Sequence, residues 1–167
     1  MSILKPRTRT MSIAVGDNLP SITLKTNGPD GPQDLNTGDF FKGRKVVLFA
    51  VPGAFTPGCS NTHMPGFVIN ADALLEKVDA IACMAVNDAF VMGAWQKDQN
   101  AERITMLADG NAELAKALGL ELDATGGCMG IRSKRFALIA NDGVVEYLGV
   151  DAKGVDKSSA DTVLKQL

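Results

Sequence analysis

Seven consecutive residues in the first third of the chain place the strongest limit on its fold. Residues 45–51 read K-V-V-L-F-A-V, a nearly unbroken apolar run. A strand with one face in water alternates apolar and polar residues, so this run is typical of a strand buried on both faces of a parallel sheet. Two later runs, residues 80–86 and 104–108, predict neighbouring strands of the same kind. Such a sheet needs helices on both of its faces.

Segments with helical spacing alternate with these runs. The segment that begins at Cys59 has an apolar stripe, and Pro65 predicts a kink or break within it. Asp88 is a capping residue for a helix over residues 88–99. The stripe of the first helix consists of Met64, Phe67, Ala71, Leu74, Leu75 and Val78, and the apolar face of the second of Phe90, Val91, Ala94 and Trp95. Shorter helices are predicted over residues 38–42, 112–118 and 158–167.

Turn residues mark the connections. Asn141-Asp142-Gly143 separates two apolar stretches, residues 135–140 and 144–148, and predicts a β-hairpin, since Asp-Gly suits the positive φ angles of a tight turn. Residues 27–32 (N-G-P-D-G-P) predict a turn after a short strand over residues 22–25. Residues 120–130 are interpreted as a connecting loop.

The resulting order is β–α–β–α–β–α–β–β–α after a short first strand. This order predicts an α/β fold with a mixed central sheet and helices on both faces. A cysteine at the start of the helix after the first long strand makes the arrangement thioredoxin-like. The chain of 167 residues has the size of one domain, residues 1–167, with a flexible N-terminus over residues 1–12.

Composition excludes several classes of protein. The formal net charge of −2 provides no broad positive field for nucleic acid or anionic membranes. Three cysteines without a C-x-x-C pair, together with one histidine, do not fit a disulfide framework or a structural zinc site. We therefore expect reduced thiols, no metal and no cofactor. The expected location is cytoplasmic, although the short basic segment at the N-terminus leaves organellar targeting open.

Cys59 is the candidate reactive group. It follows a buried strand and a Pro- and Gly-rich loop, and it opens a helix. The amide groups and partial positive charge of a helix N-terminus favour the thiolate, which is the nucleophilic form. Thr56 lies three residues upstream, within reach of the sulfur or of a bound oxygen, and His63 lies four residues downstream on the same helix face. His63 acts either as an orienting hydrogen-bond partner or, as a minority hypothesis, as a base.

The segment around Cys59 resembles a known family. Residues 51–68 read V-P-G-A-F-T-P-G-C-S-N-T-H-M-P-G-F-V, which is similar to the active-site segment of peroxiredoxins, P-x-x-x-T-x-x-C. The pattern C-x-x-x-H-x-P-G-F resembles the type II, or fifth-class, subfamily. Three later segments resemble it in the same order: residues 86–90 (V-N-D-A-F), 107–110 (L-A-D-G) and 132–138 (R-S-K-R-F-A-L).

The resemblance implies a peroxidase that reduces hydrogen peroxide and organic hydroperoxides. Cys59 is then the peroxidatic cysteine, Thr56 a hydrogen-bond partner of the peroxide, and Pro52 a shield of the pocket. Amide groups near Cys59 complete the site. The arginine of the family precedes an aromatic residue at the start of a strand, which favours Arg135 and leaves Arg132 as its rival.

A second thiol must reduce the sulfenic acid that peroxide forms on a cysteine. Cys83 resembles the second cysteine of plant members and is a possible resolving residue, whereas Cys128 has no role that the family implies. Residues 154–160 (G-V-D-K-S-S-A) lack the C-terminal cysteine of mammalian members. We therefore expect glutathione or glutaredoxin as the reductant, with thioredoxin as the partner if Cys83 takes part.

Other functions remain open at this stage. A thiol–disulfide oxidoreductase of the same fold needs C-x-x-C, which Cys59-Ser60-Asn61-Thr62 does not provide. A redox sensor or signalling protein that uses the same cysteine is the alternative to an enzyme. Relatives of type II imply a homodimer, for which Phe55 is a candidate contact if it is exposed.

Overall fold

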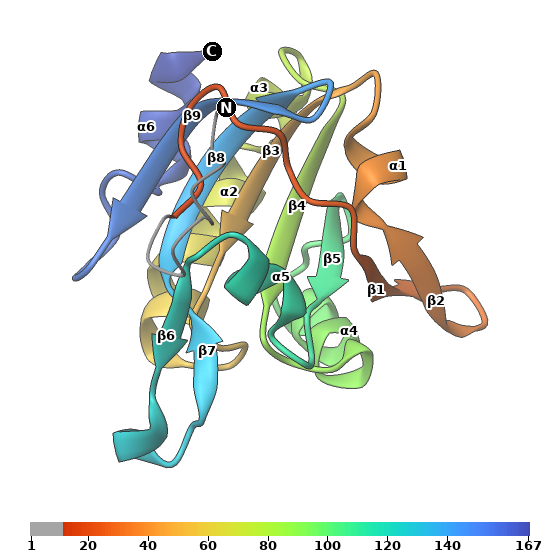
Figure 1. Ribbon diagram of the computed structural model, residues 1–167. Coiled ribbons are helices and arrows are strands. Elements are labelled where there is room, and N and C mark those ends of the chain that lie inside the picture. Colours follow the sequence, from red (N-terminus) through yellow and green to blue (C-terminus); the bar gives the residue numbers. More distant parts are fainter. Residues whose placement is uncertain (1–11) are drawn as a thin grey trace, which may run out of the picture.

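The fold is seen in a computed structural model, which describes residues 12–167 (Figure 1). The expected flexible segment, residues 1–12, lies almost wholly outside this range. Seven strands form one sheet in the order β2-β1-β5-β4-β3-β8-β9. The pairs β3–β4 and β4–β5 are parallel, and the other pairs are antiparallel, so the sheet is mixed as predicted. The strands are β1 (Thr23–Gly28), β2 (Gly31–Asn36), β3 (Lys45–Ala50), β4 (Ala80–Ala85), β5 (Ile104–Ala108), β8 (Arg135–Asn141) and β9 (Val144–Asp151).

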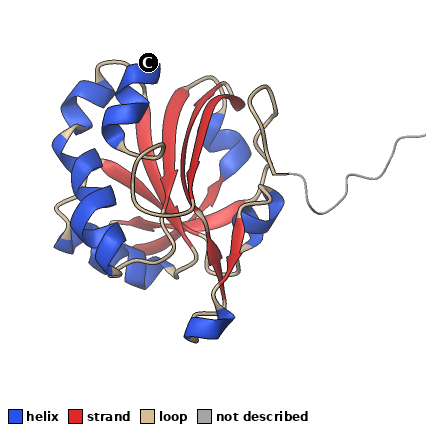
Figure 2. Cartoon of the chain, turned by 90° about the vertical axis from the view of Figure 1, so that its left-hand side faces the viewer, coloured by secondary structure: helices blue, strands red, loops and turns tan. Residues whose placement is uncertain are grey.

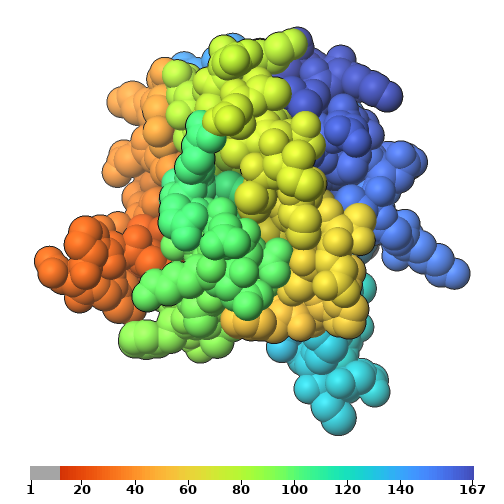
Figure 3. All heavy atoms as spheres, turned by 180° about the vertical axis from the view of Figure 1, so that it is seen from behind, coloured from red at the N-terminus to blue at the C-terminus, as the bar shows by residue number. Residues whose placement is uncertain are grey.

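Helices cover both faces of the sheet, as the apolar run of β3 predicts (Figure 2). Val47 and Phe49 of β3 pack into the core on one face, and Val46 and Leu48 pack into the core on the other. The first face is covered by α2 (Met64–Ile69), α3 (Ala71–Leu75), α4 (Ala89–Asp98) and α6 (Ala160–Gln166), which are seen from outside in Figure 3. The second is covered by α1 (Thr37–Phe41) and α5 (Glu113–Ala117). The structure is thus α/β and thioredoxin-like.

Two connections differ from the sequence prediction. The turn predicted over residues 27–32 is shorter, because β1 and β2 pair from Thr23 with Asn36 to Gly28 with Gly31. The loop predicted over residues 120–130 contains β6 (Glu121–Asp123) and the short 3₁₀-helix η2 (Thr125–Gly127), and β6 pairs with β7 (Ile131–Ser133). These strands are short or rich in polar residues, so they carry little of the apolar alternation by which strands are recognised.

The helix predicted over residues 88–99 is α4, and its cap is confirmed. The Asp88 carboxylate accepts a hydrogen bond from the Val91 amide at 2.8 Å. The predicted apolar face is wrong at Phe90, which is 75% exposed, and at Ala94, which is also exposed, whereas Met92 and Trp95 are buried. Phe90 lies in the first turn, where it faces away from the sheet.

The predicted hairpin connects β8 and β9. Asp142 and Gly143 both have positive φ, at 50° and 78°, as the Asp-Gly turn requires. Further along the hairpin, a β-bulge between Ile139 and Ala140 shifts the pairing by one residue. As a result, Arg135 at the start of β8 lies opposite Asp151 at the end of β9.

Gly143→Ala tests the backbone requirement of this turn. No atom lies within 4 Å of a Cβ at Gly143, so the expected cost comes from the left-handed backbone alone. We expect the variant to lose about 1–2 kcal/mol of unfolding free energy in urea. Gly126→Ala is the control, since that glycine also has open space but no positive φ. Equal stability of the two variants would contradict this explanation.

Candidate active site

Cys59 lies where the sheet meets the helical layer. The loop that begins at Pro52 leads from the end of β3 to a helical segment that starts at Pro57. Residues Cys59–His63 form a π-helical turn, η1, which continues into α2. The sequence predicts a kink or break at Pro65, whereas this π-helical turn lies before Pro65 in the chain. π-Turns inside helices occur frequently at functional sites. The Cys59 residue is only 1% exposed, so its sulfur is held within the structure.

Arg135 is the cation beside Cys59. It is the first residue of β8, which runs antiparallel to β3 with Phe136 opposite Ala50. The register therefore brings Arg135 to the end of β3 from which the Cys59 loop departs. Its Nη2 donates a hydrogen bond to the Cys59 Sγ at 3.3 Å. A fixed cation beside a sulfur favours the thiolate.

Gly58 provides the space for this contact. A Cβ at Gly58 would lie 3.1 Å from the Arg135 Nη2, which is tighter than ordinary side-chain packing. The glycine that precedes Cys59 therefore lets the guanidinium lie against the first turn of the helix. The structure thus gives a steric reason for the glycine before Cys59, which the sequence alone does not reveal.

His63 holds Arg135 and does not bond to Cys59. Its Nε2 lies 2.8 Å from the Ser158 carbonyl oxygen, which can only accept, so Nε2 carries the proton. The Nδ1 then accepts a hydrogen bond from the Arg135 Nη1 at 2.8 Å. With its lone pair engaged in this way, the ring orients Arg135, and the geometry favours the orienting hypothesis over the base.

Burial keeps the His63 ring neutral. Its ring centroid lies 5.1 Å from that of Phe49 and 5.6 Å from that of Phe67, and the residue is 1% exposed. Burial and the charge of Arg135 lower the pKa of His63 to about 4, against the opposing effects of Ser158 and Asp151. A neutral imidazole at physiological pH is the form that can accept from Arg135.

Thr56 and Pro52 lie in the loop that leads from β3 to Cys59. Thr56 is half-buried, and its hydroxyl donates to the Gly53 carbonyl at 2.7 Å. The Thr56 oxygen keeps lone pairs that can accept from another donor. Pro52 lines a cavity of about 420 Å³ together with Arg135, and Leu122 and Val150 add apolar surface to it.

Arg132, the rival arginine, forms hydrogen bonds to the backbone of two segments near the site. Its Nε donates to the Met129 carbonyl at 2.8 Å, and its Nη1 donates to the Val86 carbonyl at 3.4 Å. A Cβ at Gly53 would lie 3.2 Å from that Nη1, so Arg132 lies against the Cys59 loop. Of the two arginines, only Arg135 hydrogen-bonds to the sulfur.

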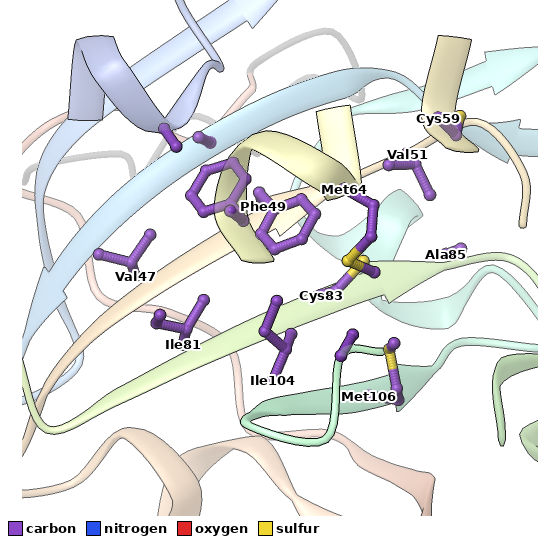
Figure 4. Packing of buried hydrophobic residues seen from close by; sticks show 14 of the residues in the cluster. Val47, Phe49, Val51, Cys59, Met64, Ile81, Cys83, Ala85, Ile104 and Met106 are labelled. Atoms are coloured by element: carbon purple, nitrogen blue, oxygen red, sulfur yellow. The ribbon is translucent and has the colours of Figure 1, made fainter. Parts of the chain in front are cut away.

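The other cysteines occupy different environments. Cys59, Cys83 and Cys128 are all free. Cys83 is fully buried in β4, on the same face of the sheet as Cys59, and Figure 4 shows the Met64 side chain extending toward it. Burial raises the pKa of the Cys83 thiol well above its usual range, and so does the nearby Cys59. Cys128 is exposed in the turn between β6 and β7.

Sequence reasoning missed two groups around the site. Ser158 is buried and contacts His63 through its backbone carbonyl, a contact that any residue type can make and that carries no sequence signal. Trp95, the single tryptophan, donates from its Nε1 to the Ser60 hydroxyl at 3.0 Å and thereby joins α4 to the turn after Cys59. Within residues 12–167, no cluster of His, Cys, Asp or Glu is arranged to hold a metal ion.

Comparison with known proteins identifies the family. Residues 14–164 match the redoxin family. The chain is 49% identical over 164 residues to chloroplastic peroxiredoxin-2E-2 of Oryza sativa, covering 93% of this chain and 73% of the relative. It is 45% identical to peroxiredoxin-2B of Arabidopsis thaliana, covering 93% of this chain and 98% of the relative. This chain belongs to the redoxin family and, within it, to the type II peroxiredoxins.

A solved structure supports the same assignment. Reduced Prx3 from Vibrio vulnificus, determined in complex with H₂O₂, superposes with a TM-score of 0.88 at 52% identity. The match covers 92% of this chain and 98% of that structure. Membership of the peroxiredoxin family gives this chain a thiol-dependent peroxidase activity.

The depressed pKa of His63 predicts a pH-dependent stability. Because the folded value of about 4 lies below the ordinary 6.5, the unfolded chain binds the proton first. The stabilising contribution is present above pH 6.5 and is lost as the pH falls toward 4. Between pH 7 and pH 4 we expect wild type to lose about 3 kcal/mol more unfolding free energy than His63→Gln. Urea denaturation measures both, and parallel pH curves would refute the assignment.

Proposed function

We propose that this peroxiredoxin reduces hydrogen peroxide and organic hydroperoxides through Cys59. The observation that carries the proposal is the 3.3 Å contact between the Arg135 Nη2 and the Cys59 Sγ. It joins a nucleophile to a fixed cation at the carboxyl end of a buried strand, where α/β proteins commonly bind ligands. The Prx3 structure, which is described as a complex with H₂O₂, supports a peroxide as the substrate of this chain.

In the proposed reaction, the Cys59 thiolate attacks one oxygen of the hydroperoxide. A sulfur–oxygen bond forms, the O–O bond breaks, and the leaving oxygen takes up a proton and departs as water or an alcohol. Cys59 is thereby oxidised to a sulfenic acid. Arg135 stabilises the thiolate and the negative charge that moves onto the leaving oxygen. Thr56 accepts a hydrogen bond from the hydroperoxide, and Pro52 restricts access of water.

The cavity beside Arg135 supports organic hydroperoxides as substrates. Its volume of about 420 Å³ and its apolar lining by Leu122 and Val150 provide room for a hydrocarbon group next to the reacting end. Hydrogen peroxide needs no such room. The cavity thus favours a range of substrates that includes larger hydroperoxides.

An external thiol is the proposed reductant. Glutathione or glutaredoxin condenses with the sulfenic acid of Cys59, releases water and forms a mixed disulfide, which a second thiol reduces. Cys83 is the alternative internal partner, with thioredoxin as the reductant. The buried position of Cys83 in the centre of the sheet disfavours that route, because its thiol would have to leave the packed core or the Cys59 helix would have to unwind.

We also propose that the protein is a homodimer. Phe55 and Phe90 are 52% and 75% exposed. Their segments are neighbours, because the Ala54 amide donates to the Asn87 side chain at 3.0 Å. Exposed aromatic residues that gather in one place are typical of protein contacts. The partner in this proposal is a second copy of the chain.

The proposed location is the cytoplasm. The relatives include chloroplastic peroxiredoxins as well as members without that description, so an organelle is the competing location. Among the helices of residues 12–167, none has both the length and the apolar character needed to cross a membrane. Neither nucleic acid nor a membrane is a partner in this proposal.

Variants of three residues test the proposed site. Cys59→Ser removes the nucleophile and should abolish peroxide consumption, measured with glutathione and glutaredoxin as reductants. Arg135→Ala should lower the rate constant for reaction with peroxide by roughly a hundredfold or more. Arg132→Ala should lower it less, because this arginine does not bond to the sulfur.

Cys128→Ser is the control for loss of a thiol, and we expect it to retain the activity of the wild type. Full activity of Cys59→Ser would exclude the mechanism. A larger loss in Arg132→Ala than in Arg135→Ala would move the role of the catalytic cation to Arg132.

A further inference from the structure

Residues 152–158, which we call the strap, connect the end of β9 to α6 and pass beside the active site. Figure 1 shows this segment returning from the tip of β9 to the helical layer. The strap has no regular secondary structure. Its last residue, Ser158, is fully buried and provides the carbonyl to which His63 is bound. The position of the strap therefore fixes the position of His63.

One carboxylate holds the strap in its fold. The Asp151 Oδ2 accepts hydrogen bonds from the Asp156 amide at 2.9 Å, the Ser158 amide at 2.9 Å and the Ser158 hydroxyl at 2.6 Å. The Asp151 Oδ1 accepts a further bond from the Lys157 amide at 3.1 Å. Burial alone would raise the pKa of Asp151, but these bonds outweigh it and lower the pKa to about 2. The carboxylate is thus ionised at physiological pH.

A second contact shows that the strap packs against β9. The Tyr147 hydroxyl donates to the Lys157 carbonyl at 2.7 Å. A Cβ at Gly149 would collide with that carbonyl, so the strap lies directly on the backbone of β9. Asp151 and Tyr147 together fix the strap at the end of the sheet where Arg135 begins.

The register of the hairpin gives Asp151 a second effect. The bulge in β8–β9 places Asp151 directly opposite Arg135, and side chains opposite each other in an antiparallel pair lie on the same face. An acid in that position is expected to form an ion pair with the arginine. Here the ion pairs of residues 12–167 do not include one between Asp151 and Arg135. The carboxylate is bound to the strap, and the guanidinium remains with Cys59 and His63.

We propose that Asp151 is a positioning residue for the active site. It acts through the strap, the Ser158 carbonyl and His63, and it holds Arg135 against Cys59 without neutralising it. Its role in peroxide reduction rests on the proposed function, whereas its effect on the Cys59 thiolate does not require that function.

The test is Asp151→Asn, with Asp156→Asn as the matched control. Each variant removes one negative charge, from Asp151 at the end of β9 or from Asp156 in the strap, but the Asp156 carboxylate accepts none of the hydrogen bonds that hold the strap. The first readout is the pH dependence of Cys59 alkylation by iodoacetamide, located by peptide mapping. The second is the rate constant with hydrogen peroxide, followed by the fluorescence of Trp95, which bonds to the residue next to Cys59.

For Asp151→Asn we expect the alkylation midpoint to move to higher pH and the peroxide rate constant to fall roughly ten- to a hundredfold, since displaced catalytic groups have effects of this size. Asp156→Asn should match wild type in both readouts. Ser158→Ala removes one bond to Asp151 but keeps the carbonyl, and should shift both readouts in the same direction by less. If Asp151→Asn does not fold, Ser158→Ala takes its place as the test of the proposal.

A double variant separates positioning from general destabilisation. If Asp151 acts through Arg135, adding Asp151→Asn to Arg135→Ala should change the alkylation profile by no more than about twofold in rate. A full additional loss would overturn the proposal, and so would an unchanged alkylation profile in Asp151→Asn. A wild-type protein that is alkylated as expected but does not consume peroxide would instead refute the proposed function.

Discussion

The bridge that Arg135 makes between Cys59 and His63 is the contact on which the site depends. One nitrogen of the guanidinium donates to the Cys59 sulfur and another to the His63 ring. Each bond constrains the other, since a planar guanidinium presents its donors in a fixed fork. The bridge requires a glycine at position 58, a neutral histidine and a strand register that delivers Arg135 to the end of β3. The sequence supplies the glycine, and the fold supplies the other two.

The apolar core and the reactive site are parts of one structure. Phe49 of β3 stacks on Phe67 of α2 with ring centroids 3.9 Å apart, and the same two rings surround His63. Burial in this cluster is what lowers the pKa of His63 and leaves its Nδ1 free to accept from Arg135. Packing of the core therefore sets the protonation state of a group in the active site.

Sequence patterns predicted the parts of the fold that local chemistry determines. The buried strand at residues 45–51, the Asp88 cap and the Asp142-Gly143 turn each have a local signal, and each is present in the structure. The pair β6–β7 was missed because each strand has only 3 residues. Phe90 was misplaced because helical spacing does not say which apolar residues face the sheet.

The site shows the same division between local and long-range information. The sequence motif locates Cys59, Thr56 and Pro52, which are close together in the chain. The partnership of Arg135 with Cys59 depends on the pairing of β8 with β3, and the placement of Asp151 opposite Arg135 depends on one β-bulge. Without that bulge, Val150 would lie opposite Arg135, because a shift of one residue reverses which side chains share a face. No periodicity in the sequence indicates such a shift.

The most direct test of the central claim is the mass of the reduced protein after one equivalent of hydrogen peroxide. The measurement is made with and without a reagent that traps sulfenic acids, and peptide mapping then locates the modification. We predict a trapped adduct on Cys59 and no internal disulfide, as expected for a cysteine that waits for an external thiol. A disulfide between Cys59 and Cys83 would contradict the proposed reductant. An unmodified Cys59 would contradict the account of the site itself.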